Sequence, residues 1–266
     1  MLRNFLFPVY HKSPVHTVLG QAEFVRAFEP EKVFLLHVAS GHGQRTAKRI
    51  ERIETGMREL GLPVERVVRY GHVPSQIVTT AEATKSIICF TKKWKNPIKK
   101  AVAGSVTSDV VRMSDEPVLI YTKGLSAHAG GALHTSMYAT DFKHSDKACI
   151  EYIRHKAFTA KRLVLLHVGQ RAPDPETEKK RLENVYANLA RLASECQNGF
   201  EHIEKREVLG LGVDRKILHH ARKESVDLLV IGKLDSQGIM SRFTGTTAEA
   251  LYNRAPCSVL IIPSKG

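Results

Sequence analysis

A glycine-containing loop near the end of the chain combines residue types that can hold a phosphate group. Gly232 follows an apolar, β-branched run at 226–231, and Gly245-Thr246-Thr247 opens a helical pattern further on. Glycines between a buried strand and a helix N-terminus expose backbone N–H groups and the positive end of the helix dipole. We therefore predict an anion site here. Thr246 and Glu249 also have capping-box spacing, which a well-capped helix alone would explain.

The sequence contains none of the common catalytic motifs that we sought. The chain lacks GxxxxGK[ST], HExxH and GxSxG segments. His37 and His167 recur within two LLHV segments and fit a structural role, while His219-His220 has no carboxylate or cysteine at ligand spacing. Four scattered cysteines without CxxC spacing fit buried, reduced thiols in a cytoplasmic protein. We expect neither a metal site built on cysteines nor an enzyme.

Composition describes an ordinary globular chain with a basic surplus. Its 266 residues suffice for two domains, with 42% hydrophobic and 25% charged residues. No apolar run reaches a membrane-spanning length, and the N-terminal segment 1–13 is typical of a first strand, not a signal peptide. The net charge of +13 favours anionic partners of some kind but does not choose among nucleotides, nucleic acids and lipids.

Strand and helix patterns alternate along the whole chain, which predicts parallel sheets with helices on both faces. Ser13-Pro14 is interpreted as an N-cap followed by the first helical residue. In the first half the patterns predict strands at 4–10, 32–39, 64–70, 85–90 and 117–122, with helices at 13–28, 44–60, 74–84 and 105–113. In the second half they predict strands at 134–140, 162–168, 201–208, 226–231 and 258–262, with helices at 144–158, 176–196, 214–224 and from Gly245 to Ala255.

The second half repeats the first in residues as well as in pattern. VFLLHV at 33–38 returns as LVLLHV at 163–168, and the spacing from Phe90-Thr91 to Gly104-Ser105 returns between Ile231-Gly232 and Gly245-Thr246. A small-residue linker, GLSAHAGG, separates the copies at 124–131. The chain is thus a tandem duplication, with domains expected at 1–125 and 126–266.

Both halves resemble universal stress protein domains. The resemblance rests on MYATDFKHSDKACIEYI at 137–153, LVLLHV at 163–168 and LLVIG…TGTTAEALYNRAPCSVLII at 228–262. It implies two α/β, Rossmann-like domains of the adenine nucleotide alpha hydrolase-like type, each a five-stranded parallel sheet of order 3-2-1-4-5. It also implies a homodimer or a pseudo-dimer of the two halves. In such a sheet the ligand crevice lies between the ends of the first and fourth strands, where the order reverses.

The resemblance assigns an adenine nucleotide (AMP, ADP or ATP) to the second half. Asp141 would meet the ribose or adenine, although capping of the next turn is an alternative, and Val168 would face adenine through its backbone. The full set of expected nucleotide-binding residues is Ala139, Thr140, Asp141, Val168, Ile231, Gly232, Lys233, Asp235, Gly245, Thr246 and Thr247.

Asp235 departs from the family pattern, which has a glycine at this position. A carboxylate about 6 Å from a phosphate charge costs about 2–3 kcal/mol, roughly a hundredfold in affinity. Lys233 and Arg242 would offset part of this cost, and Asp235 could instead hold Mg²⁺ or point outward. We expect a preference for AMP or ADP over ATP, or weak binding.

The first half has lost most of the motif. Tyr10 replaces Asp141, and Thr91 and Trp94 replace the loop glycines, so we expect no nucleotide there. The loop 91–100 carries five lysines and the single tryptophan, which suit either a nucleic-acid patch or a solvated basic loop, and the second is favoured.

Taken together, these features predict a cytoplasmic stress-response nucleotide sensor that acts through its second domain and performs at most slow ATP hydrolysis. The alternative is a nucleotide-free interaction module using its dimer surface and loop 91–100.

Overall fold

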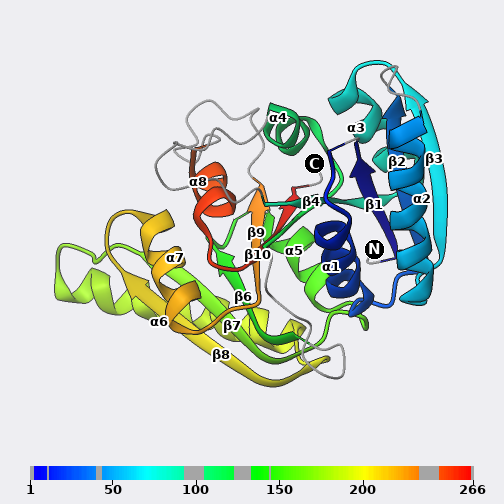
Figure 1. Cartoon of the computed structure of the whole chain (residues 1–266). Helices are drawn as coiled ribbons and strands as arrows, with labels where there is room; N and C mark the ends of the chain where they lie inside the picture. The colour runs from blue at the N-terminus through cyan, green and yellow to red at the C-terminus, as the bar shows by residue number, and fades with distance from the viewer. Residues whose placement is uncertain are drawn as a thin grey trace. The chain divides into compact units, whose positions relative to one another are not determined.

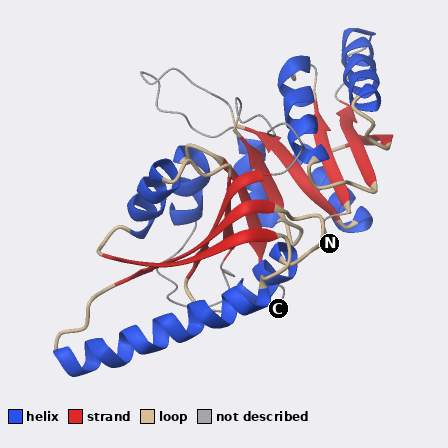
Figure 2. Ribbon diagram, turned by 90° about the horizontal axis from the view of Figure 1, so that it is seen from below, coloured by secondary structure: helices blue, strands red, loops and turns tan. Residues whose placement is uncertain are grey.

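The computed structural model describes residues 3–10, 12–39, 44–92, 105–122, 133–143, 145–233 and 246–264. The chain divides into two compact units, Met1–Gly131 and Ala132–Gly266. Each unit is an α/β domain whose described strands are parallel, with helices on both faces (Figures 1 and 2). The predicted fold class is therefore confirmed in both copies.

In the first unit the described strands are ordered β3-β2-β1-β4-β5. The strands are β1 (Asn4–Val9), β2 (Lys32–Ala39), β3 (Val64–Tyr70), β4 (Ser86–Thr91) and β5 (Val118–Tyr121). The helices are α1 (Val15–Arg26), α2 (Gln44–Glu59), α3 (Val73–Thr84) and α4 (Ser105–Met113).

In the second unit the same order appears as β8-β7-β6-β9-β10. The strands are β6 (Leu133–Thr140), β7 (Ala160–Gly169), β8 (Phe200–Leu209), β9 (Leu228–Lys233) and β10 (Ser258–Pro263). The helices are α5 (Ser145–Ile153), α6 (Pro175–Glu195), α7 (Val213–Lys223) and α8 (Thr246–Arg254). Both units thus have the predicted strand order 3-2-1-4-5.

The central strands are buried on both faces because each face is covered by helices. In β9 the first four residues are buried, and all of β10 is buried. Helix α5 packs against β9 and β10, α6 against β7 and β8, and α7 against β7 and α8. All four cysteines are buried and free, as the sequence predicts.

Two predicted helix ends are wrong for local reasons. Pro14 has extended backbone (φ −71°, ψ 123°) and is itself the N-cap of α1. The Ser13 hydroxyl instead accepts a hydrogen bond from the Tyr10 amide at 3.0 Å, which closes the preceding turn. Helix α5 ends at Ile153 rather than Phe158, because the Phe158 amide bonds to the carbonyl of His155, three residues back, at 2.7 Å.

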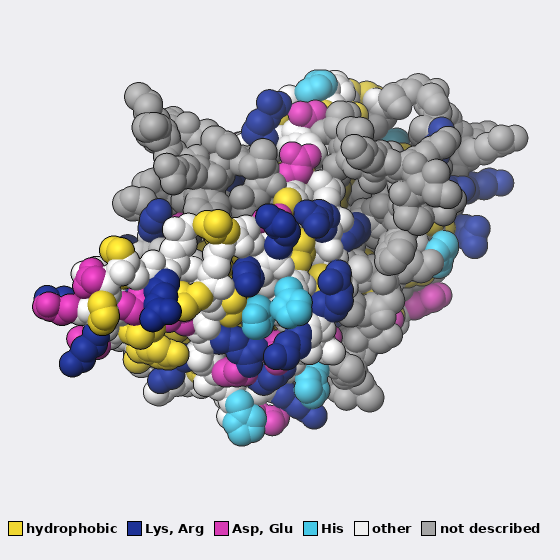
Figure 3. Space-filling model, turned by 90° about the vertical axis from the view of Figure 1, so that its left-hand side faces the viewer, with side chains coloured by type: hydrophobic (Ala, Val, Ile, Leu, Met, Phe, Trp, Pro, Cys, Tyr) yellow, Lys and Arg dark blue, Asp and Glu magenta, His cyan; other side chains and the backbone are white. Residues whose placement is uncertain are grey.

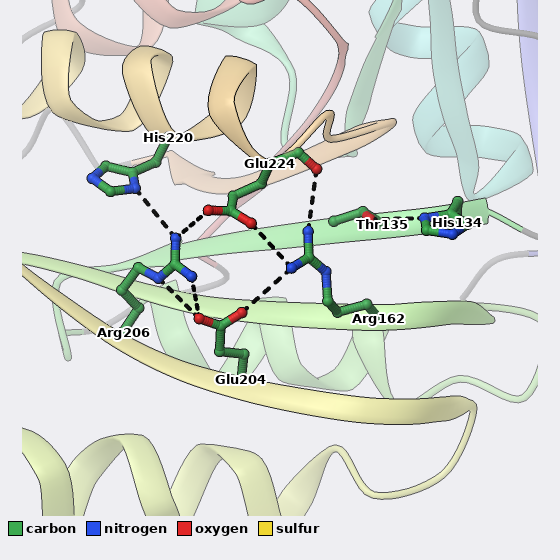
Figure 4. A network of polar contacts seen from close by, with 7 residues as sticks. All are labelled: His134, Thr135, Arg162, Glu204, Arg206, His220 and Glu224. Atoms are coloured by element: carbon green, nitrogen blue, oxygen red, sulfur yellow. Dashed lines mark hydrogen bonds and ion pairs between the residues drawn. The ribbon is translucent and has the colours of Figure 1, made fainter.

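The outer strand β8 is charged on both faces and has a helix on each. Glu204 and Arg206 face α7, where Arg206 forms ion pairs with both Glu204 and Glu224 (Figure 4). Arg162 of β7 joins this network, with 3.0 Å to Glu224 and 3.5 Å to Glu204. On the opposite face Glu207 pairs with Arg181 of α6. These ion pairs add to the apolar packing of α6 and α7, which bury Leu189, Leu192, Ile217 and Leu218.

Candidate functional site

The ends of β6 and β9 lie side by side at the point where the strand order of the second unit reverses. Ala139 pairs with Ile231 in register. The residues that come next in the two parallel strands, Thr140-Asp141 and Gly232-Lys233, therefore lie at the same edge of the sheet. Thr140 is buried, while Asp141, Gly232 and Lys233 are half-buried. The structure therefore brings these predicted residues together at the crevice position of an open parallel sheet.

The Asp141 carboxylate already makes one local contact. Its Oδ1 accepts a hydrogen bond from the Lys143 amide at 3.1 Å, an Asx turn that shapes the entry to α5. The next residue, Phe142, has a left-handed backbone (φ 59°), and its amide donates to the Thr140 hydroxyl at 2.9 Å. This hydrogen bond supports the capping alternative for Asp141. It uses only one of the two carboxylate oxygens.

His167 fixes the strand end beside the crevice. Its Nδ1 donates to the Thr140 carbonyl at 3.0 Å, and its ring stacks on Phe142 at 4.3 Å between centroids. In the first unit His37 makes the same bond, from Nδ1 to the Val9 carbonyl at 3.2 Å. The two histidines therefore have the structural role that the repeat predicts. Val168, the next residue, is half-buried at the end of β7.

The phosphate side of the predicted site is described only at its helix. Helix α8 begins at Thr246, followed by Thr247, so their amides belong to its first turn. Asp235 and Gly245 lie outside the described residues, as do the side chains of Thr246 and Thr247.

A buried polar cluster beneath the crevice was not among the predicted site residues. Asp146 of α5 accepts hydrogen bonds at Oδ1 from the Tyr138 hydroxyl and from the Thr140 hydroxyl, the latter at 2.7 Å. Its Oδ2 is buried without a partner in the described part of the chain. Burial raises the pKa of Asp146, against the opposing effect of the two hydroxyl bonds, and nearby Asp141 raises it further. The available signal was an acid on the apolar face of α5, in line with buried Cys149 and Ile150.

The corresponding positions of the first unit have different chemistry. Tyr10, which replaces Asp141, is 42% exposed. Thr91, in place of the first loop glycine, donates its hydroxyl to Gln21 Oε1 at 3.0 Å. Ser105 begins α4, whereas Trp94 and Gly104 lie outside the described residues. The described part of this edge carries no carboxylate at the position of Asp141.

The described residues contain neither a membrane-spanning helix nor a metal-binding cluster. No helix of this part of the chain is long and apolar enough to cross a bilayer. Across the same residues, no three His, Cys, Asp or Glu side chains gather in a way that could hold a metal ion.

These features define a tandem α/β protein whose second unit brings polar residues together at its strand reversal. The universal stress protein family model matches residues 134–263, so this domain belongs to that family. No curated protein matches the sequence.

Solved structures match both units together. A universal stress protein from Archaeoglobus fulgidus aligns over 98% of each chain with a TM-score of 0.74 and 18% identity. A functionally unknown protein from Pseudomonas aeruginosa aligns over 98% of this chain and 92% of its own, with a TM-score of 0.67 and 16% identity. The cytoplasmic domain of a prokaryotic cation chloride cotransporter aligns over 98% and 96%, with a TM-score of 0.55 and 16% identity. At these identities the likeness concerns the fold, which extends across the whole chain.

Proposed function

We propose that the second unit binds an adenine nucleotide in the crevice at the ends of β6 and β9, and that the protein acts as a nucleotide-dependent regulator in a stress response. The observation that carries this proposal is the register of Ala139 with Ile231, which sets Asp141 beside Gly232 and Lys233 at the strand reversal. The choice of adenine rests on the family resemblance of the motif.

Each end of the crevice supports one part of a nucleotide. Asp141 offers its second carboxylate oxygen to ribose hydroxyls, since the Lys143 amide occupies Oδ1. Val168 offers backbone groups at the end of β7, where the strand is half-buried. The first turn of α8 offers amides and a helix dipole to phosphate. In the proposed mechanism, bound nucleotide holds residues 233–244 in one arrangement and so alters the surface offered to a partner or a second protomer.

The first test is the content of the purified protein. We expect denatured protein to release AMP, ADP or ATP, identified by absorbance and mass spectrometry. Release of nothing, together with no thermal shift on adding nucleotide, would contradict the proposal and favour the nucleotide-free interaction module.

The second test uses matched variants from the two copies. Asp141→Ala should weaken nucleotide binding, measured by isothermal titration calorimetry, whereas Tyr10→Ala at the equivalent position of the first unit should leave it unchanged.

Asp235→Gly should tighten ATP binding by up to roughly a hundredfold, because it removes a carboxylate near the phosphates. Equal ATP affinity of Asp235→Gly and the parent would show that Asp235 does not oppose phosphate.

A further inference from the structure

A cavity of about 440 Å³ lies between α5 and α6 of the second unit. Right-handed crossovers place these two helices on the face of the sheet opposite α7 and α8. The cavity is therefore separate from the first turn of α8, which belongs to the proposed nucleotide crevice. Its volume falls within the range of small-molecule sites.

The first unit closes the equivalent space by direct helix packing. There α1 and α2 lie against each other, and a Cβ added at Gly56 would stand 2.8 Å from the δ carbons of Leu19. Val9 and Thr140 end the equivalent strands β1 and β6, and Leu19 and Ile150 are separated by the same number of residues as this pair. Ile150 therefore occupies on α5 the place that Leu19 has on α1. In the second unit, however, Ile150 lines the open cavity. The opening is thus a property of this copy and not of the fold.

The cavity lining combines an apolar part with a surplus of positive charge. Half-buried Phe142 supplies apolar surface, and Ile150, which is 2% exposed, lies at the base of the cavity. The charged lining residues are the cations Lys143, Lys147, Arg154 and Arg191 and the carboxylates Asp146, Glu151 and Glu195. Arg191 is paired with Glu195 at 2.6 Å. The remaining three cations, all exposed, outnumber the carboxylates Glu151 and Asp146 by one, a surplus that favours an anion.

Asp146 adds an unfilled acceptor to the same lining. It is 6% exposed and lines the cavity, and its Oδ2 has no hydrogen-bond partner among the described residues. Buried polar atoms in folded proteins almost always have partners. A hydroxyl group of a ligand, or an ordered water between the ligand and Asp146, would donate the missing hydrogen bond to Oδ2.

We propose that the α5–α6 cavity is a second ligand site, which takes a small phosphate monoester with an apolar or aromatic body. The phosphate would lie among Lys147, Arg154 and Lys143, and the organic part would lie on Phe142 and Ile150. This site lies on the face of the unit opposite α8, while Phe142 and Lys143 of its lining directly follow Asp141 of the crevice in the chain.

The test titrates phenyl phosphate into the full chain at low salt by isothermal titration calorimetry, with phenol as the uncharged probe. We expect phenyl phosphate to bind and phenol not to bind measurably. The double variant Lys147→Gln/Arg154→Gln should lose roughly tenfold or more in affinity, because each cation contributes roughly fivefold at contact distance. Both side chains are exposed, so their replacement leaves the core unchanged.

The matched control is Lys179→Gln/Lys205→Gln, which removes the same charge from exposed positions outside the cavity lining. Lys179 lies about 18 Å along α6 from Arg191. This control should change the affinity less than twofold. The proposal is overturned if phenyl phosphate does not bind the parent, if the Lys147/Arg154 variant binds it as tightly as the parent, or if the control loses as much affinity.

Discussion

At the scale of single residues, Asp146 shows how one carboxyl group can connect the crevice to the cavity. It accepts hydrogen bonds from the hydroxyls of Tyr138 and Thr140 of β6, and it lines the cavity from its place on α5. Thr140 in turn accepts the Phe142 amide and offers its carbonyl to His167. The side chains that shape the crevice edge therefore meet at this one buried acid.

Asp146→Asn should change the pH dependence of stability. Burial raises the folded pKa of Asp146 above its ordinary value, so its favourable contribution to stability is present below that ordinary value and is lost as the pH rises through the folded pKa. The asparagine keeps an oxygen for both hydroxyls but does not ionise. Measured by urea unfolding, the stability of the variant relative to the parent should rise between pH 3 and pH 7.

Asp174→Asn provides the control of opposite sign. The Thr177 amide lowers the pKa of this exposed N-cap carboxylate, so its contribution is present above the unfolded pKa and is lost as the pH falls. This variant should lose stability relative to the parent as the pH rises from acid to neutral. If the difference between Asp146→Asn and the parent did not vary with pH, the pKa assignment would be wrong.

Residue roles were predictable where the repeat marked them. His37 and His167 recur at equivalent strand positions, and both prove to bond a neighbouring strand's carbonyl. Asp146 has no such mark, because an acid near the start of a helix is also what a favourable first turn contains. Only its burial in three dimensions separates the two roles.

At the scale of elements, α2 ends in a Schellman motif that requires a left-handed residue. Gly61 has φ 79°, its amide bonds to the Arg58 carbonyl at 2.9 Å, and the Leu62 amide bonds to the Met57 carbonyl at 3.1 Å. Gly61→Ala should lower the free energy of unfolding by about 1 kcal/mol, because the methyl group strains this backbone although it meets no atom within 4 Å. Urea titration measures the change.

Gly61→Asn is the companion variant, because asparagine tolerates left-handed backbone better than alanine does. It should cost less than Gly61→Ala. An equal cost for both variants would mean that something other than backbone conformation sets the helix end.

Glu224 joins the end of α7 to both β7 and β8. Its carboxylate pairs with Arg206 and with Arg162, and the Arg206 contact lowers its pKa (Figure 4). Glu224→Gln should therefore destabilise the protein at neutral pH by about 2 kcal/mol, the scale of a hydrogen bond to a charged group. Thermal and urea unfolding would measure the loss.

The same variant has a defined acid response. The contribution of Glu224 to stability is present above its unfolded pKa and is lost as the pH falls through the lower folded pKa. The deficit of Glu224→Gln should therefore shrink in acid. A deficit that stayed constant to low pH would point to lost packing rather than lost charge.

Element positions were largely predictable, and their ends were not always so. β2 and β3 have the predicted bounds, because apolar runs and turn residues mark both ends. β4 begins at Ser86 and not at Lys85, since Lys85 takes the left-handed C-cap of α3 (φ 48°), a conformation that its residue type does not favour. Helix ends depend on such single backbone choices, whereas helix and strand existence depends on periodicity.

At the scale of the whole molecule, the two copies share a fold but differ at the crevice edge. A single nucleotide per chain is therefore expected, bound by the second unit. Calorimetry should give a stoichiometry of one. A stoichiometry of two would show that the first unit has kept a site despite Tyr10 and Thr91.

The overall charge is consistent with anionic ligands without naming one. The chain carries 40 Lys and Arg against 27 Asp and Glu, and one face shows Lys, Arg and His side chains together (Figure 3). The fold was predictable at this scale because the duplication repeats its pattern over the whole chain. The segments 93–104 and 234–245 lie outside the described residues.

The outer strands of the two sheets, β3 and β8, have a consequence for behaviour under heat or acid. Unpaired strand edges invite a second chain to add its own strand, which is a route to aggregation. β8 carries Glu204, Lys205, Arg206 and Glu207 in succession, and β3 carries Glu65, Arg66 and Arg69. A chain approaching either edge would have to strip water from several charges at once. Both edge strands are therefore protected against cross-β growth.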